Sequence, residues 1–481
     1  MDELLNKIKE QETIANQLEI ELSDRQQLLK KVSDFANQYI EALPEAKAFI
    51  EKEAVAENLK INNNTKTIDE ILNVFKEEVT ETGIRAASGG HLGYIPGGGI
   101  YAAALGDFLA SISNEYAGIF YASPGAVTIE NEVINWLKKV FSFPETAVGN
   151  LASGGSISNL IALTAARDQH QIKNEKITRS VIYLSSQVHH CIQKSLRIIG
   201  LEDVIIRYTP LDKEYKIDAL ALEKQIQSDK SAGLNPFLVV ASAGTTDTGA
   251  IDPLDDIAEI AHKNNLWFHI DAAYGGFFIL TSKRDLFKGI EKADSLVIDP
   301  HKSLFLPYGL GAVLVKNAQA VLHSNHYMAN YMQDAFSDDL VKSPANVSPE
   351  LTKHFRGLRL WLPLQLHGIE PFVASLEEKL LLTEYFREKL RTLGFHTGAK
   401  PDLSVSYFWY PYQNDENEFN KKLMYHIHQD GNVFLSSTLL DGKFVIRMAI
   451  LSFRTKKATI DKALEMIQSS LQKTLQEFSN S

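Results

Sequence analysis

Phe237 to Ile270 reads FLVVASAGTTDTGAIDPLDDIAEIAHKNNLWFHI, and this stretch decides the fold. It holds an apolar run at Phe237–Ala241, a helical pattern at Pro253–Asn264 and a second apolar run at Leu266–Ile270. Two short apolar runs joined by a helix predict neighbouring parallel strands that are buried on both faces.

The same alternation extends in both directions, from about residue 150 to residue 315. We predict further strands at Ser180–Leu184, Val204–Tyr208, Ser295–Ile298 and Gly311–Val315, and further helices at Ile157–Arg167 and Val188–Ile199. The pattern predicts an α/β domain whose mostly parallel sheet is covered by helices on both faces. Ligands of such domains collect at the carboxyl ends of the strands, so we look for functional residues there.

Three parts are predicted along the chain. Residues 1–84 form an N-terminal helical segment, with a helix over about 2–42 whose apolar stripe packs either on its own body or on a second copy. Residues 85–365 form the large domain, including a loop at 318–349 that lacks clear periodicity and is expected to cover the site. Residues 366–481 read as helix, strands and helix, which predicts a small C-terminal α+β domain.

Composition narrows the function classes. With 481 residues, of which 44% are hydrophobic and 23% charged, the chain reads as an ordinary globular protein. A net charge of −11 without a basic tract argues against nucleic-acid binding. The single cysteine, Cys191, fits a reducing compartment, and we find neither a secretory signal in MDELLNKIKE nor an apolar run long enough for a bilayer. We therefore expect a cytoplasmic protein that does not bind membranes.

A glycine-serine loop, Ser153-Gly154-Gly155-Ser156, directly precedes a helical pattern. Glycines let the backbone approach an anion, the helix N-terminus offers unpaired N–H groups, and Ser156 adds a hydroxyl. The same residues also suit a plain N-cap turn, so an anion site is one of two interpretations.

Two charged residues follow predicted strands. Lys302, after Ser295–Ile298, would become nucleophilic towards an aldehyde if burial in a pocket lowered its pKa; otherwise it is a surface lysine. Asp271, after Leu266–Ile270, would hydrogen-bond the protonated ring nitrogen of a pyridine cofactor and make the ring an electron sink; otherwise it is a turn or N-cap aspartate.

His189 follows the predicted strand Ser180–Leu184, where an imidazole could stack on an aromatic cofactor ring. Its neighbour His190 raises the question of a metal site. Adjacent residues on a helix point in different directions, so we expect no bound metal.

In this order and spacing, the elements resemble the group II pyridoxal-phosphate decarboxylases, which include the aromatic amino-acid, histidine and glutamate decarboxylases. Five segments carry the resemblance: Ser153–Arg167 (SGGSISNLIALTAAR), Ser185–Ser195 (SSQVHHCIQKS), Ala243–Thr246 (AGTT), His269–Gly275 (HIDAAYG) and Asp299–Lys302 (DPHK). Weaker likeness extends to Gly93–Pro96, Ser123-Pro124, Phe355–Trp361 and Val445–Arg447, so it spans about residues 85–460.

The resemblance implies a type I aminotransferase-like fold, pyridoxal 5′-phosphate as cofactor, and an obligate homodimer with active sites at its interface. That favours the N-terminal helix as a dimer contact. It also implies a role for each matching residue: the phosphate is held by Gly154, Gly155 and Ser156 with His301 nearby, the ring lies between His189 and Ala273, the ring nitrogen pairs with Asp271, a Schiff base forms on Lys302, and Thr246 lies near the cofactor.

By the same resemblance the chain is a carboxy-lyase that converts an L-amino acid to its amine. Family members protonate the carbanion from a loop tyrosine, and Tyr327 and Tyr331 are the candidates here, with Tyr331 as our choice. No tyrosine occurs from Met332 to Trp361. A missing donor would divert the chemistry towards an aldehyde, towards transamination or towards another lyase reaction, for example on a phosphorylated amino alcohol.

The predicted substrate wall departs from the aromatic amino-acid decarboxylases. Where they have Tyr-Phe-Pro, this chain has Tyr94-Ile95-Pro96 followed by three glycines, so we do not assume an aromatic substrate. Arg447 either meets a substrate carboxylate or forms a structural ion pair. A third hypothesis, a non-catalytic binding or regulatory relative, is disfavoured because Lys302, Asp271 and His189 are all present.

Overall fold

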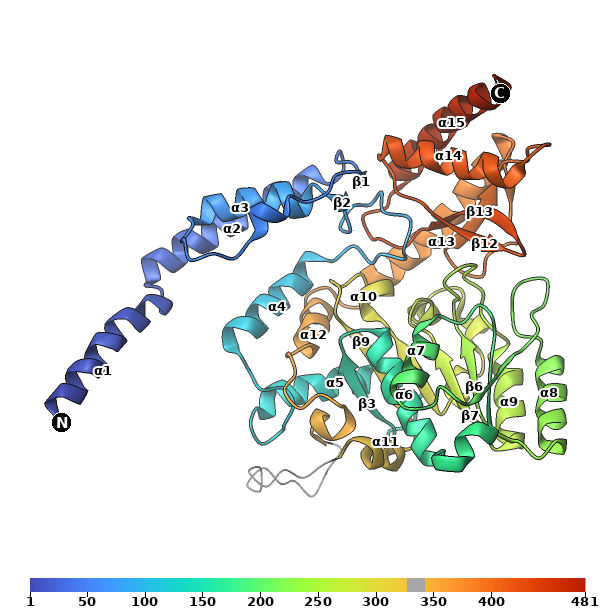
Figure 1. Ribbon diagram of the computed structural model, residues 1–481, viewed down its shortest axis with the longest axis horizontal. Coiled ribbons are helices and arrows are strands. Elements are labelled where there is room, and N and C mark those ends of the chain that lie inside the picture. Colours follow the sequence, from blue (N-terminus) through green and yellow to red (C-terminus); the bar gives the residue numbers. More distant parts are fainter. Residues whose placement is uncertain (327–341, 481) are drawn as a thin grey trace.

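The computed structural model describes residues 1–326 and 342–480. Figure 1 shows an N-terminal helical arm that extends away from a central body, with the C-terminal elements at one end of that body. In the described part of the chain, no helix is both long and apolar enough to cross a membrane.

The central body is built on a seven-stranded sheet in the order β3-β9-β8-β7-β6-β4-β5. Its strands are β3 Val148–Ala152, β4 Ser180–Leu184, β5 Ile205–Tyr208, β6 Asn235–Ser242, β7 Trp267–Asp271, β8 Ser295–Ile298 and β9 Gly311–Val315. The pairs β5–β4, β4–β6, β6–β7 and β7–β8 are parallel, whereas β9 is antiparallel to both β8 and β3. The predicted α/β fold with a mostly parallel sheet is confirmed.

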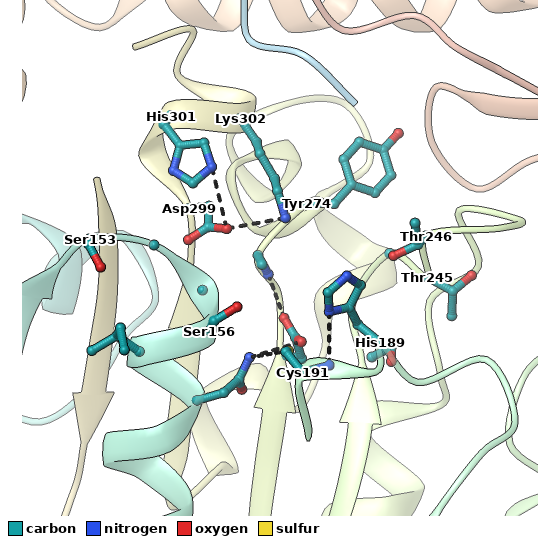
Figure 2. A pocket seen from close by; sticks show the side chains of 18 of the residues that line it. Ser153, Ser156, His189, Cys191, Thr245, Thr246, Tyr274, Asp299, His301 and Lys302 are labelled. Carbon is teal, nitrogen blue, oxygen red and sulfur yellow. Dashed lines mark hydrogen bonds and ion pairs between the residues drawn. The ribbon is translucent and has the colours of Figure 1, made fainter. Parts of the chain in front are cut away.

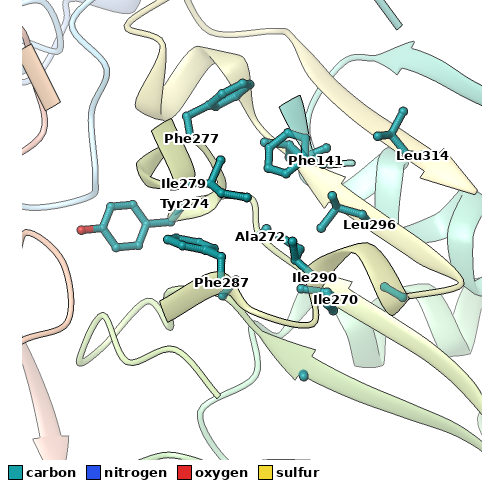
Figure 3. Close-up of a cluster of buried hydrophobic side chains, with 14 of the residues drawn as sticks. Phe141, Ile270, Ala272, Tyr274, Phe277, Ile279, Phe287, Ile290, Leu296 and Leu314 are labelled. Carbon is teal, nitrogen blue, oxygen red and sulfur yellow. The ribbon is translucent and has the colours of Figure 1, made fainter. Parts of the chain in front are cut away.

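Both faces of this sheet are covered, because alternate side chains of a strand point to opposite faces. In β6, Val239 and Ala241 join one hydrophobic core while Leu238 and Val240 join the other. The first core also takes side chains from α5 (Pro124–Val140), α8 (Ala219–Ser231) and α9 (Leu254–Asn264); Figure 3 shows part of it. The second core takes side chains from α6 (Gly155–Gln169), α7 (Cys191–Ile198) and α11 (Ala318–Asn325).

The C-terminal part has its own antiparallel sheet in the order β10-β11-β13-β12. Its elements are β10 His396–Thr397, β11 Val405–Trp409, β12 Ser436–Leu440, β13 Lys443–Ala449, α13 Glu370–Thr392, α14 Glu416–Asp430 and α15 Lys457–Ser479. Side chains from all three helices and the sheet share a separate hydrophobic core. The predicted small C-terminal α+β fold is confirmed.

The N-terminal arm consists of α1 (Asp2–Ala15), α2 (Leu22–Ala42) and α3 (Ile68–Phe75). The helix expected over 2–42 is therefore interrupted, with a 3₁₀ turn after α1. The short strands β1 (Phe49–Ile50) and β2 (Gly83–Ile84) pair at the base of the arm. The next helix along the chain, α4 (Tyr101–Ser113), packs against α12 (Gly357–His367).

Two local predictions were wrong. The helix expected from Val188 starts only at Cys191, and the residues before it form a turn in which the His189 Nδ1 accepts the Cys191 backbone N–H at 3.3 Å. The loop expected over 318–349 begins with α11, whose start is capped by Asn317 through the Gln319 N–H. Tyr327 and Tyr331 lie outside the described residues.

Candidate active site

A cavity of about 290 Å³ lies at the carboxyl ends of the central strands. Its lining comes from the segments that follow β3, β4, β6, β7 and β8, which the parallel topology brings to one edge of the sheet. Figure 2 shows Lys302 and His301 entering from one side, Ser153 and Ser156 from another, and His189 facing them. The predicted residues Gly154, Gly155, Ser156, His189, Thr246, Asp271, Ala273, His301 and Lys302 all line this cavity.

Lys302 lies on α10 (Pro300–Ser303), directly after β8. Its Nζ is 3.2 Å from the Asp299 Oδ2, and its side chain is 26% exposed, which excludes a free surface lysine. Burial lowers the pKa of Lys302, but the Asp299 and Asp271 carboxylates outweigh it, so the pKa is raised overall. The lowered pKa that we expected from burial is therefore not found, because two carboxylates stabilise the ammonium form.

Asp271 is the last residue of β7, and its side chain is largely buried. Its Oδ1 accepts the Ala273 backbone N–H at 3.0 Å, and its Oδ2 accepts an amide proton from Asn159 at 3.2 Å. The hydrogen bond from the Ala273 N–H is typical of a turn aspartate, so the alternative interpretation of Asp271 as a turn residue is confirmed in part. The carboxylate also lines the cavity, where it is available to a ligand.

His189 lies in the loop after β4 and lines the cavity. Burial lowers its pKa, and the nearby His190 and Lys302 lower it further against the opposing effect of Asp271. Its ring lies only 4.1 Å from the His190 ring, so our argument that the two point apart was wrong. Within residues 1–326 and 342–480, no three His, Cys, Asp or Glu side chains are arranged so that they could hold a metal ion.

The start of α6 forms a cradle from Gly154, Gly155 and Ser156, in which the two glycines leave the backbone open to the cavity. Gly154 has a φ of +153°, which favours glycine, and a Cβ on Gly155 would lie 2.9 Å from the Asp299 Oδ2. The first N–H groups of a helix have no partner within it, so this cradle suits a phosphate group. Across from it, the His301 Nδ1 donates to the Leu310 carbonyl at 2.6 Å. The glycines, the helix start and the cavity lysine together fit pyridoxal phosphate.

Four residues predicted to contact substrate do not line this cavity: Tyr94, Ile95, Pro96 and Arg447. Tyr94 is 62% exposed, while Ile95 and Pro96 are buried, Ile95 with a positive φ of 55°. Arg447 makes no ion pair with any described residue; it donates to the carbonyls of Thr246 and Gly93 and to the Ser436 hydroxyl. Arg447 therefore links its own strand to the segments that contain Thr246, Gly93 and Ser436. The alternative prediction, that Arg447 forms a structural ion pair, was wrong.

Among the residues that line the cavity but were not predicted as site residues, Asp299 and Asn159 contact predicted ones. Asp299 precedes Lys302 by three residues, which places both on one face of a helical turn; that spacing was the available signal. Asn159 lies on α6, one turn after the glycine cradle. Its contact with Asp271 spans 112 positions of sequence, and no local pattern reports it.

The chain was compared with known proteins. The family model described as "Pyridoxal-dependent decarboxylase conserved domain" matches residues 51–411. An aromatic-L-amino-acid decarboxylase of Bacillus atrophaeus is 36% identical over 375 residues, covering 76% of this chain and 77% of the relative. A phenylacetaldehyde synthase of Petunia hybrida is 29% identical over 399 residues, covering 78% and 79%.

A solved structure supports the fold. The tryptophan decarboxylase of Catharanthus roseus, crystallised with L-tryptophan, superposes with a TM-score of 0.87 at 24% identity, covering 95% of this chain and 99% of that chain. With the extent of the family match and the 36% identity, the conclusion is that this chain belongs to the pyridoxal-dependent decarboxylase family.

Proposed function

We propose that Lys302 carries the pyridoxal 5′-phosphate of this decarboxylase and that an L-amino acid loses its carboxyl group in the cavity around it. The observation that carries the proposal is the convergence of Lys302, Asp271 and His189, from the ends of three strands, on one cavity. The phosphate cradle at Gly154–Ser156 lies in the same cavity, so a cofactor held there is within reach of all three.

When bound, the cofactor supplies an electron-withdrawing ring that takes up the electron pair left by departing carbon dioxide. Asp271 keeps a proton on the ring nitrogen through its negative charge. His189 and Ala273 would hold the ring, and the α6 N–H groups with the Ser156 hydroxyl would bind the phosphate. Held in this way, the cofactor would be positioned so that the bond to the substrate carboxyl group is the one that breaks.

Proton return to the α-carbon decides the product. We assign this step to Tyr331, with Tyr327 as the other candidate. Replacing Tyr331 with phenylalanine should lower amine formation and raise the share of aldehyde, measured by product analysis. Unchanged amine formation would remove Tyr331 as the donor.

A second candidate function is aldehyde formation on the same site. The observation that favours it is the 29% identity to a protein named phenylacetaldehyde synthase. The relative with 36% identity carries an aromatic amino-acid decarboxylase name, so aromatic L-amino acids come first in the substrate panel. Both reactions release carbon dioxide. Amine as the other product supports decarboxylation, whereas aldehyde that forms with consumption of dioxygen and release of ammonia and hydrogen peroxide supports the second function.

We propose that the enzyme is a homodimer with active sites at its interface, and that the arm belongs to that interface. No residue of α1 or α2 is buried, although both carry large apolar side chains, and α4 exposes more: Leu4, Ile8, Leu22, Leu29, Val32, Leu105, Phe108, Leu109 and Ile112. A second copy of the chain would cover them. Light scattering should give twice 53.7 kDa, and a monomer would contradict this.

The remaining proposals concern organisation and location. We keep the division into residues 1–84, 85–365 and 366–481. We also propose a cytoplasmic enzyme; the single cysteine, Cys191, is buried and has no second cysteine to pair with.

The test of the main proposal is Lys302→Ala. Turnover should disappear, and borohydride should no longer fix the cofactor to the chain, because no amine remains at the cofactor aldehyde. Circular dichroism checks that the variant folds. Persistent fixation in Lys302→Ala would refute the assignment.

A further inference from the structure

A line of buried side chains leads from the sheet interior to Asp271. The Trp267 indole donates to the Ser295 hydroxyl at 2.8 Å, and this hydroxyl lies 2.8 Å from the His269 Nδ1. The His269 Nε2 lies 2.7 Å from the Asn159 Oδ1, and the Asn159 amide reaches the Asp271 Oδ2 at 3.2 Å. His269, Ser295 and Asn159 are fully buried, so their polar atoms depend on one another.

The chemistry of the two ends fixes the direction of every hydrogen bond in this line. An ionised aspartate only accepts, so the Asn159 NH₂ group faces Asp271 and its carbonyl oxygen faces His269. The His269 Nε2 must then carry a proton and donate it. In a neutral ring the Nδ1 accepts, so the Ser295 hydroxyl donates to it. At the other end the Trp267 N–H, which can only donate, supplies Ser295.

We propose that Trp267, Ser295, His269 and Asn159 form a neutral, one-directional hydrogen-bond relay that positions Asp271 for the cofactor ring nitrogen. The relay holds His269 as the neutral Nε2–H tautomer and the Asn159 amide in one orientation. These four are positioning residues, since they act through Asp271. The inference rests on the proposed function of Asp271.

A neutral His269 leaves the negative charge of Asp271 intact. An imidazolium next to Asn159 would lie close enough to Asp271 to offset part of its charge, which the ring nitrogen needs. Burial lowers the pKa of His269 and outweighs the raising effects of Asp271 and of a hydrogen bond to the Ser295 backbone, so the pKa is about 4. The ring therefore stays neutral at pH 7. Asp271 gains a fixed hydrogen bond without losing charge to a cationic partner.

The first test reads the tautomer in the full chain, with and without pyridoxal phosphate, by ¹⁵N NMR of labelled histidine. We expect one histidine signal with a proton on Nε2 and none on Nδ1, unchanged between pH 6 and pH 8 and missing from His269→Gln. A proton on Nδ1, or an imidazolium at pH 6, would overturn the relay.

The second test measures cofactor affinity. Asn159→Leu should bind pyridoxal phosphate about tenfold more weakly, because it loses one hydrogen bond to a charged group. Ser158→Ala is the matched control: Ser158 is the preceding residue of α6, fully buried, and its hydroxyl has no partner among the described residues. Equal affinities for the two variants would count against the proposal.

Rescue separates positioning from packing. His269→Leu removes the donor to Asn159, whereas His269→Gln supplies an amide N–H in its place, so the glutamine variant should bind the cofactor more tightly than the leucine variant. The reverse order would contradict the relay. If borohydride failed to fix the cofactor on Lys302, the proposed function would fall while the His269 tautomer could still be read.

Discussion

Asp271 is the last residue of β7, and Asp299 directly follows the neighbouring parallel strand β8. The surroundings of the two carboxylates differ. Asp271 is held by neutral donors, the Ala273 backbone N–H and the Asn159 amide. Asp299 instead faces the Lys302 ammonium at 3.2 Å, and its buried Oδ1 has no hydrogen-bond partner in the part of the chain that the structure describes.

The two aspartates of this cavity therefore serve different purposes because their hydrogen-bond and ion-pair partners differ. Neutral donors hold a carboxylate in place without neutralising its charge. The Asp271 carboxylate can therefore pair with the protonated ring nitrogen of the cofactor for as long as the cofactor is bound. An ion pair holds Lys302 only until this amine reacts, which suits Asp299. If this comparison holds, removing each carboxylate should change a different step.

The largest effect is expected from Asp271→Asn. The amide carries no charge to hold a proton on the ring nitrogen, so kcat should fall on the order of hundredfold to thousandfold, the cost of removing one partner of a buried charge pair. Steady-state kinetics measures this, and borohydride fixation on Lys302 should persist. A kcat within threefold of the parent enzyme would break the comparison.

Asp299→Asn should act on cofactor capture. Lys302 attacks the cofactor aldehyde as a neutral amine, so its raised pKa means that capture accelerates as pH rises. Removing Asp299 lowers this pKa, increases the neutral fraction at a given pH, and shifts the rate profile towards lower pH. Stopped-flow absorbance after mixing with pyridoxal phosphate measures the profile. A profile that stays in place or moves to higher pH contradicts the role of Asp299.

A smaller effect should follow from Gly155→Ala. The new Cβ would lie 2.9 Å from the Asp299 Oδ2, so the carboxylate must shift and the phosphate cradle narrows. Overpacking of this kind should weaken cofactor binding about tenfold, measured by equilibrium titration. Gly125→Ala on α5, where a Cβ would meet nothing within 4 Å, is the control and should bind normally. Equal cofactor affinities of the Gly155→Ala and Gly125→Ala variants would contradict the role of Gly155 in binding the phosphate.

The sequence predicted every strand of the large sheet except β3, because the others are short apolar runs between turn residues, whereas Gly149 and Asn150 interrupt the apolar pattern of β3. β4, β8 and β9 have the bounds that the apolar runs predict. Parallel topology then places the ends of these strands together, so the candidates at Asp271 and Lys302 follow from local patterns and one rule about sheets.

Other features depend on contacts that no periodicity records. Helix α7 starts at Cys191, three residues later than its helical pattern predicts, after a turn in which the His189 Nδ1 accepts the Cys191 N–H. The bond between Asn159 and His269 spans 110 positions, and the raised pKa of Lys302 needs the placement of two carboxylates. The apolar stripe of the N-terminal helices could be predicted from the sequence, but the surface against which this stripe packs could not.

The central claim, that Lys302 carries the cofactor, is tested most directly by locating the attachment. The enzyme would be loaded with pyridoxal phosphate, reduced with borohydride and digested, and the peptides analysed by mass spectrometry. We expect one modified peptide, with the added mass on Lys302. A modification confined to another lysine, or the absence of any modified peptide, would contradict it.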